Sequence, residues 1–185
     1  MAWEDERWLR HTFALAERAV DEGDQAYGAA LVDSAGNLLL EAANQRQRSG
    51  RCTAHAETDL VSEASQLWPR TLLSGCTLYS STEPCPMCAG AIAWSGVGRL
   101  VYGLSQERSY ALARFEPPPR FIEPPSCRAI LGNVQPPIEV LGPLLEDEAT
   151  AVHLRWYALH AGEPSALPTL QNEKPPRGVT GGGFC

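Results

Sequence analysis

The sequence predicts an α/β fold in which helices cover a single β-sheet. Two observations lead to this prediction. Apolar residues make up 44% of the 185-residue chain and charged residues 20%, a balance typical of one globular domain. Segments of helical and of strand character follow one another over residues 5–104 in the order α-β-β-α-β-α-β, which is typical of a sheet with helices packed on it.

The first predicted elements are a helix and a hairpin. Residues 5–22 carry apolar side chains at three- and four-residue steps, which predicts an amphipathic helix, and Gly23 provides its end. Residues 27–32 and 37–42 are apolar, and the turn-forming segment 33–36 joins them. This pattern predicts two strands paired as a β-hairpin.

Four further elements follow over residues 53–64, 77–81, 84–94 and 99–104; the first and third are predicted helices and the others strands. Thr53 provides an N-cap for the first of these helices. Pro84 and Pro86 favour the start of the second helix, because proline fits the first turn of a helix and not its interior. We expect Trp94, at the end of this helix, to lie in the core or in a dimer contact.

The C-terminal part of the chain differs in composition. Eight of the 15 prolines fall within residues 115–143, which predicts an ordered but irregular excursion rather than a second domain. Residues 139–145 are expected to add an edge strand. Residues 146–160 are expected to form a last helix, acidic at its start as the helix dipole favours. We therefore expect one domain over residues 1–161, followed by a tail over residues 162–185.

The chain has 15 basic and 22 acidic side chains and a formal net charge of −7. Such a balance argues against a protein that holds nucleic acid mainly by charge. No apolar run approaches the roughly 18–20 residues that span a bilayer, and the acidic start lacks the features of a signal peptide. We expect a cytoplasmic protein without membrane contact, whose six cysteines are reduced thiols or metal ligands.

One group of residues predicts a metal site. His55 stands in the first turn of one predicted helix, and Cys85 and Cys88 lie three residues apart at the start of another. The N-terminus of a helix stabilises thiolates through its free N–H groups and its dipole. Zinc prefers tetrahedral nitrogen and sulfur ligands, and three protein ligands leave one position for water. The pattern therefore predicts one zinc ion per subunit, held by these three side chains.

Glu57, two residues after His55, indicates which kind of zinc site this is. A carboxylate is not needed as a ligand beside two thiolates. As a general base, Glu57 can take a proton from water that zinc activates, and can pass it to a ring nitrogen and to a departing amine. The alternative is a closed structural site with Cys52 as the fourth ligand, and this alternative gives Glu57 no role.

Thr53-Ala-His55-Ala-Glu57 and Glu83-Pro-Cys85-Pro-Met-Cys88 together form the H-x-E and P-C-x-x-C signature of zinc deaminases. Residues 26–104 resemble the cytidine and deoxycytidylate deaminase superfamily, in particular the branch of guanine deaminases, yeast-type cytosine deaminases and tRNA adenosine deaminases. The resemblance implies a three-layer αβα sandwich with a mixed central sheet, here of about five strands. It also implies a hydrolysis that replaces an exocyclic amine with a carbonyl and releases ammonia.

The resemblance further implies roles for individual residues. The three predicted ligands would hold zinc, and Glu57 would shuttle protons. The residues expected to contact the substrate are Asn44, Tyr27, Ala56 and Glu116. Asn44 matches the family's substrate-binding asparagine, and an amide offers both a donor and an acceptor to the edge of a base. Most proteins of this branch self-associate, so the resemblance also implies a homodimer. The histidines of the predicted helices, His153 among them, receive no role.

Differences within the branch predict the substrate. The tRNA deaminases usually carry Pro-Val-Gly-Ala where this chain has Ala26-Tyr27-Gly28-Ala29, and their final helix is basic, whereas residues 146–148 are acidic. Guanine deaminases place an acidic residue near the position of Glu116, and often an aromatic residue at that of Tyr27. This favours a small nucleobase or nucleoside, a guanine-like purine first and cytosine close behind. The alternatives are a tRNA-specific adenosine deaminase and a non-catalytic structural-zinc module.

Overall fold

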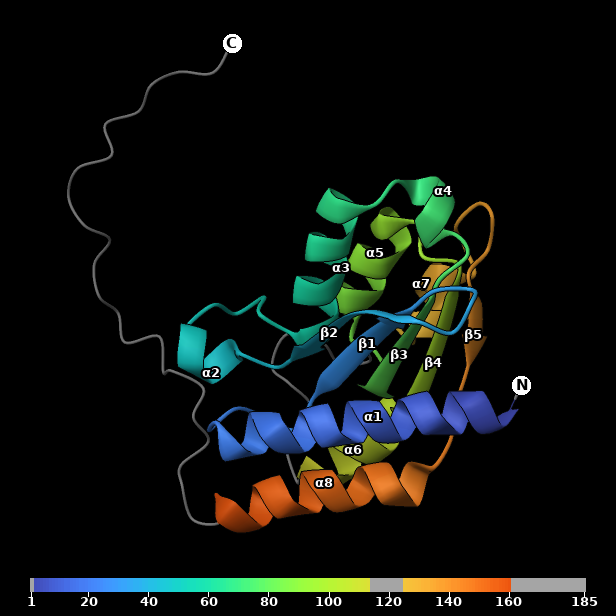
Figure 1. Cartoon of the computed structure of the whole chain (residues 1–185). Coiled ribbons are helices and arrows are strands. Elements are labelled where there is room, and N and C mark those ends of the chain that lie inside the picture. Colours follow the sequence, from blue (N-terminus) through green and yellow to red (C-terminus); the bar gives the residue numbers. More distant parts are fainter. Residues whose placement is uncertain (1, 114–124, 161–185) are drawn as a thin grey trace, which may run out of the picture.

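The computed structural model describes residues 2–113 and 125–160 (Figure 1). Its strands form one sheet in the order β2-β1-β3-β4-β5. They are β1 Gly28–Val32, β2 Leu38–Ala43, β3 Thr77–Thr82, β4 Arg99–Leu104 and β5 Glu139–Leu141. Strand β1 is antiparallel to both β2 and β3, whereas β3, β4 and β5 are parallel to one another. The predicted mixed sheet of about five strands is confirmed.

Helices pack on both faces of this sheet. They are α1 Ala2–Asp21, α2 Arg46–Ser49, α3 Ala56–Leu67, α4 Arg70–Leu73, α5 Pro86–Ser95, α6 Gln106–Ala113, α7 Cys127–Leu131 and α8 Glu146–Leu159. Helices α3, α5 and α7 cover one face, and α1 and α8 cover the other (Figure 1). The predicted three-layer arrangement is therefore confirmed.

Two apolar clusters fill the spaces between these layers. One cluster joins Leu60 of α3 and Ile92 of α5 to Leu78 of β3. The other joins Phe13 of α1 and Trp156 of α8 to the opposite face of the sheet. Strand β1 is buried along its whole length, because helices cover both of its faces.

Two predictions about the fold need correction. The edge strand expected over residues 139–145 is shorter, since β5 ends at Leu141. The next two residues are Gly142, whose φ is 144°, and Pro143, which has no N–H group to donate to a neighbouring strand. Trp94 is not part of the core, because it is 83% exposed near the C-terminal end of α5. This exposure excludes the core and agrees with a location in a dimer contact, which stays a prediction.

Some expectations fall on parts of the chain that are not described. The excursion over residues 115–143 is described from residue 125 onward, where it contains α7 and β5. Glu116 and the tail expected over residues 162–185 lie outside the described residues. Of the helices in the described part of the chain, none is both long and apolar enough to span a membrane.

Candidate active site

Three side chains that could bind a metal meet where α3 and α5 begin. His55 is the N-cap residue of α3, and Cys85 is the N-cap residue of α5. Cys88 follows in the first turn of α5, whose first residue is Pro86. Proline suits this position because the first N–H groups of a helix have no partner within it. Since α3 and α5 lie side by side on the sheet (Figure 1), the three side chains come together.

The spacing of the three ligand atoms fits a tetrahedral zinc site. The sulfur atoms of Cys85 and Cys88 are 3.6 Å apart, and Nδ1 of His55 lies 3.7 Å from the first and 3.5 Å from the second. Zinc bonds of about 2.3 Å to sulfur and about 2.0–2.1 Å to nitrogen would separate two sulfurs by about 3.8 Å and a sulfur from a nitrogen by about 3.6 Å. No other group of at least three histidine, cysteine or acidic side chains in the described residues could hold a metal ion.

The charges of this cluster favour a bound cation. The hydrogen bonds with Cys88 and His55 lower the pKa of Cys85 to about 4. The hydrogen bond to Cys85, together with burial, raises the pKa of Cys88. Burial lowers the pKa of His55, but the hydrogen bond to Cys85 and the charge of Glu57 outweigh it, so that this pKa is raised overall. One thiol ionises easily and the second resists, so a positive charge between them is needed to hold both as thiolates.

Glu57 lies in the first turn of α3, beside the three ligand atoms, and is buried. Its Oε1 accepts a hydrogen bond from the hydroxyl group of Ser80 at 3.0 Å, and its Oε2 is 3.6 Å from the sulfur of Cys88. Burial raises the pKa of the Glu57 carboxyl group above its ordinary value. The group can therefore bind and release a proton closer to neutral pH than an exposed glutamate can.

Asn44 presents a buried hydrogen-bond acceptor. The residue is 1% exposed and directly follows β2. Its backbone N–H donates to the carbonyl oxygen of Tyr27 at 2.9 Å, and its Nδ2 lies 3.4 Å from the carbonyl oxygen of Gln25. Its Oδ1 has no hydrogen-bond partner among the described residues. A buried polar atom without a partner costs free energy, and a ligand or a water molecule that donates to it removes that cost.

Tyr27 directly precedes β1, and its ring contacts α8. Its ring centroid is 5.2 Å from that of His153 in α8, and the two rings are inclined by 71°. Burial raises the pKa of the Tyr27 hydroxyl group, and the negative charge of Glu57 adds to the effect. Ser109 of α6 interacts with this hydroxyl group and lowers its pKa, an effect smaller than that of burial. The expected contact of Tyr27 with the substrate stays a prediction.

Glu83 connects two helices to the cluster, and sequence reasoning assigned it no role. Its Oε2 accepts the backbone N–H of Gln106, at the start of α6, at 3.1 Å. Its Oε1 accepts the backbone N–H of Cys127, at the start of α7, also at 3.1 Å. One carboxylate thus satisfies free N–H groups of two helix N-termini. The glutamate is visible in the motif before Cys85, but the two helices that it caps were not predicted.

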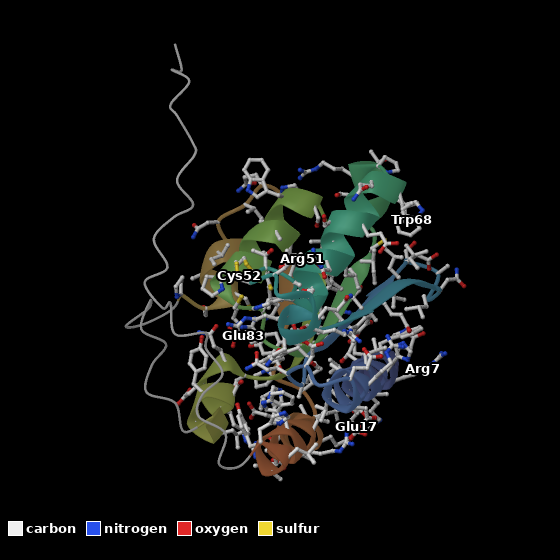
Figure 2. All side chains as sticks on the ribbon, turned by 90° about the vertical axis from the view of Figure 1, so that its left-hand side faces the viewer. Arg7, Glu17, Arg51, Cys52, Trp68 and Glu83 are labelled. Carbon is white, nitrogen blue, oxygen red and sulfur yellow. The ribbon has the colours of Figure 1, made fainter. Side chains whose placement is uncertain are left out.

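Ala56 and Cys52 are not among the three side chains that could hold a metal. The side chain of Ala56 is fully buried and packs in the core cluster beneath α3. Cys52 is exposed and does not belong to the group that could hold a metal. Figure 2 shows Cys52 and Glu83 on the face of the molecule turned toward the viewer. A closed site with Cys52 as the fourth ligand is therefore not supported.

Residues 2–104 match the family model of the cytidine and deoxycytidylate deaminase zinc-binding region. The chain belongs to this deaminase family. It is 43% identical to a probable cytosine deaminase from Schizosaccharomyces pombe over 151 residues, which are 80% of this chain and 90% of that protein. It is 38% identical to a tRNA-specific adenosine deaminase from Bacillus subtilis over 100 residues, 54% of this chain and 62% of that protein. A guanine deaminase structure from Nitrosomonas europaea has a TM-score of 0.66 and 26% identity, covering 82% of this chain and 83% of that one.

These similarities confirm the predicted family, the reaction type and the metal. The protein is a hydrolytic deaminase of nucleobases or nucleosides, and its cofactor is zinc. The names of its relatives include cytosine, guanine and tRNA adenosine deaminases. Membership of the family therefore defines the chemistry and leaves the choice among these substrates to the details of the site.

Proposed function

We propose that this deaminase removes the exocyclic amine of a small nucleobase or nucleoside, with a guanine-like purine as the first candidate and cytosine as the second. The observation that supports this proposal most directly is the Oδ1 atom of Asn44, which is buried and has no hydrogen-bond partner in the described part of the chain. The backbone N–H of Gln45 donates to the carbonyl oxygen of Ala54 at 3.1 Å, which brings Asn44 to the segment that ends in His55. An acceptor at this point can receive an N–H group from the edge of a base.

The proposed reaction depends on four side chains. His55, Cys85 and Cys88 hold zinc, which as a Lewis acid makes water a better nucleophile at neutral pH. Glu57 takes a proton from the attacking water and delivers it to a ring nitrogen. It then takes the remaining proton of the added hydroxyl group and delivers it to the amine, which leaves as ammonia as the C–N bond breaks and the carbonyl forms. The raised pKa of Glu57 suits both steps, because the carboxyl group can hold the proton between them. Ser80 holds Oε1 of Glu57 in place by its hydrogen bond.

The two candidate substrates have different support. The similarity to a guanine deaminase extends over most of the fold and favours the purine. The 43% identity to a probable cytosine deaminase extends over 80% of the chain and favours cytosine. Both are small planar bases with an amine beside a ring nitrogen, so the proposed use of Glu57 and Asn44 is the same for either.

A tRNA substrate has less support. The similarity to the tRNA-specific adenosine deaminase covers 54% of this chain. Helix α8 begins with Glu146, Asp147 and Glu148, and its Arg155 forms an ion pair with Asp21. A protein that binds a polynucleotide needs basic groups to neutralise phosphates. The last helix presents acidic groups instead.

Ammonia release by the zinc-loaded protein tests the proposal. The substrates compared are guanine, cytosine, adenine, their nucleosides and an adenosine-containing anticodon stem-loop. We expect release from one free base or nucleoside, and a kcat about 10²–10⁴ times lower in Glu57→Gln, because the amide cannot carry the proton. The zinc content of this variant should equal that of the wild type, since the three ligands are intact.

Asp59→Asn is the matched control for this experiment. Asp59 lies in the same turn of α3, but its carboxylate forms a partly exposed ion pair with Arg51. Its substitution should leave kcat within about twofold of the wild type, because a surface ion pair contributes little. Activity on the stem-loop alone would replace the proposal by a tRNA deaminase. Absence of release from every substrate in the comparison would refute it.

We also propose that two copies of the chain associate through α3 and α5. Trp94 is 83% exposed on α5, and Met87 of the same helix is also exposed. A groove of about 290 Å³ lies between α3 and α5. It is lined by Thr58, Val61, Ser62, Ser65, Ala91, Trp94 and Ser95. A face that presents both an exposed indole and a largely apolar groove can pack on its own copy about a twofold axis, so that each Trp94 fills the groove of the other subunit.

Sedimentation analysis of Trp94→Arg tests this association. We expect a dimer for the wild type and a monomer for the variant, because a buried guanidinium without a partner would oppose the contact. Leu159→Arg is the matched control, since Leu159 is an exposed apolar residue on α8, in the opposite layer. That variant should remain dimeric. A monomeric wild type, or a dimer in both variants, would contradict the proposed interface.

A further inference from the structure

His153 is a buried histidine that the proposed reaction does not use. It lies in α8 and is 3% exposed. Its Nε2 is 2.9 Å from the hydroxyl oxygen of Thr82. Its ring meets the ring of Tyr27 edge to face, with 5.2 Å between the centroids. Helix α8 therefore reaches two separate segments of the candidate site through one side chain.

Both partners of His153 lead directly to site residues. Thr82 is the last residue of β3 and stands three residues before Cys85. Tyr27 accepts the backbone N–H of Asn44 at 2.9 Å through its carbonyl oxygen. The side chain of His153 thus contacts Thr82, in the strand that leads to Cys85, and Tyr27, whose backbone is hydrogen-bonded to that of Asn44.

The ring of Tyr27 is restrained on two sides. Ser109 in α6 interacts with its hydroxyl group, and the ring of His153 meets the ring of Tyr27 from α8. Edge-to-face aromatic pairs favour a limited range of relative orientations. Burial lowers the pKa of His153 to about 4, so the contact at neutral pH is between two uncharged rings. The two helices together therefore hold the ring in one orientation.

We propose that His153 is a positioning residue, which holds the ring of Tyr27 as an ordered wall of the substrate pocket. This inference rests on the proposed function and on the expectation from the sequence that Tyr27 contacts the substrate. A base that binds against an ordered wall does not have to restrict the movement of the wall on binding, and its affinity is higher for that reason. His153 therefore affects KM for the base and leaves the proton transfer by Glu57 unchanged.

Two substitutions separate the two contacts of His153. His153→Gln keeps atoms that can hydrogen-bond to Thr82 and removes the ring. His153→Phe keeps a ring against Tyr27 and removes the hydrogen bond. We expect His153→Gln to raise KM about three- to tenfold with kcat within about twofold, which is the range that one aromatic pair accounts for. His153→Phe should keep KM near the wild-type value and lower Tm, because Thr82 loses its buried partner.

His160→Gln is the matched control, because it makes the same substitution at the end of the same helix. His160 stacks on Trp156 with 3.5 Å between the ring centroids, and its Nδ1 lies 2.9 Å from the carbonyl oxygen of Trp156. The KM of the His160→Gln variant should equal that of the wild type. In a Tyr27→Leu background, where the wall is already lost, His153→Gln should change KM by less than about twofold, since coupled residues do not act additively.

The outcomes distinguish this inference from the proposed function. If the wild type deaminates a base and His153→Gln has an unchanged KM, the inference fails and the proposed function stands. The inference also fails if the effects of His153→Gln and Tyr27→Leu on KM multiply. It fails as well if His153→Gln loses zinc, because His153 would then support the segment from Thr82 to Cys85 and not the ring of Tyr27. If the wild type deaminates neither a base nor a nucleoside, the proposed function fails and the inference with it.

Discussion

Glu57 and Asp59 both lie in the first turn of α3 but differ in burial. The side chain of Asp59 is 23% exposed and forms an ion pair with Arg51, whereas Glu57 is 5% exposed and lies against Cys88 and Ser80. A carboxylate that has lost its water holds a proton at a higher pH. One turn of helix thus supplies both a surface charge and a group suited to carrying a proton.

His153 makes the stability of the protein depend on pH. Burial lowers its pKa to about 4 in the folded protein, from an ordinary value of 6.5. Between these two values the unfolded chain binds a proton that the folded protein does not, so the free energy of unfolding falls as the pH is lowered. The loss begins near pH 6.5 and is complete near pH 4. At pH 5 we expect His153 to account for a loss of about 2 kcal/mol relative to pH 7.

Urea unfolding of the zinc-loaded wild type and His153→Gln at pH 7 and pH 5 measures this effect. The wild type should lose about 2 kcal/mol more than the variant over this interval, because glutamine has no proton to gain. Other groups that titrate in this range, including the zinc ligands, contribute equally to both proteins and cancel in the difference. Equal losses in the two proteins would contradict the prediction.

At the level of elements, α1 approaches β1 closely because Gly28 has no side chain. A Cβ atom at this position would lie 2.5 Å from the carbonyl oxygen of Thr12 and 2.7 Å from the Cβ of Leu15. Both neighbours belong to α1, and the first is backbone, so neither can move without shifting the helix. The distance between this helix and the sheet therefore depends on one glycine.

Gly28→Ala should lower the free energy of unfolding by about 2 kcal/mol, within the range for overpacking a filled interior. Gly75→Ala is the matched control, because the nearest atom to a Cβ at Gly75 is 3.5 Å away, an ordinary contact distance. Its effect should stay within about 0.5 kcal/mol. Urea unfolding of both variants checks the prediction, and similar losses at the two positions would contradict it.

At the level of the whole molecule, one buried ion pair connects two layers. Arg99 of β4 donates two hydrogen bonds to Asp5 of α1, at 2.7 and 2.9 Å, and the hydroxyl group of Tyr79 in β3 donates a third at 2.8 Å. The hydrogen bonds from Arg99 lower the pKa of Asp5 below its ordinary value. The stabilisation from ionised Asp5 is therefore complete above about pH 4 and is lost as the pH falls through the lower pKa of the folded protein.

Asp5→Asn should lower the free energy of unfolding at pH 7 by about 2 kcal/mol. This is less than the roughly 3–5 kcal/mol of a fully buried pair, because the side chain of Arg99 is 26% exposed. Asp21→Asn, which breaks the exposed pair with Arg155, is the control and should cost less than about 1 kcal/mol. Guanidinium unfolding at pH 7 and pH 3 measures both. The effect of Asp5→Asn should shrink at pH 3, and an undiminished effect there would contradict the prediction.

Much of the fold could be predicted because it depends on short-range patterns. The periods of the apolar residues predict the first helix, the hairpin and the two helices that carry the candidate ligands. Helices α6 and α7 were not predicted, because they have eight and five residues and because the carboxylate that accepts their first N–H groups comes from Glu83, far away in the sequence. The sequence could not decide between the core and the surface for Trp94 for a related reason, since no pattern within α5 shows which of its faces lacks a covering helix.

By itself, the sequence determined which side chains stand at the starts of the two helices, and hence the zinc chemistry and the reaction type. His55 and Glu57 are two residues apart, and Cys85 and Cys88 are three apart, so the relevant geometry is that of a single helical turn. The contacts of His153 with Thr82, 71 residues away, and with the ring of Tyr27 follow from the packing of α8 and are not visible in the sequence. Contacts of this kind depend on how separate layers pack, and local propensity and spacing carry no information about that packing.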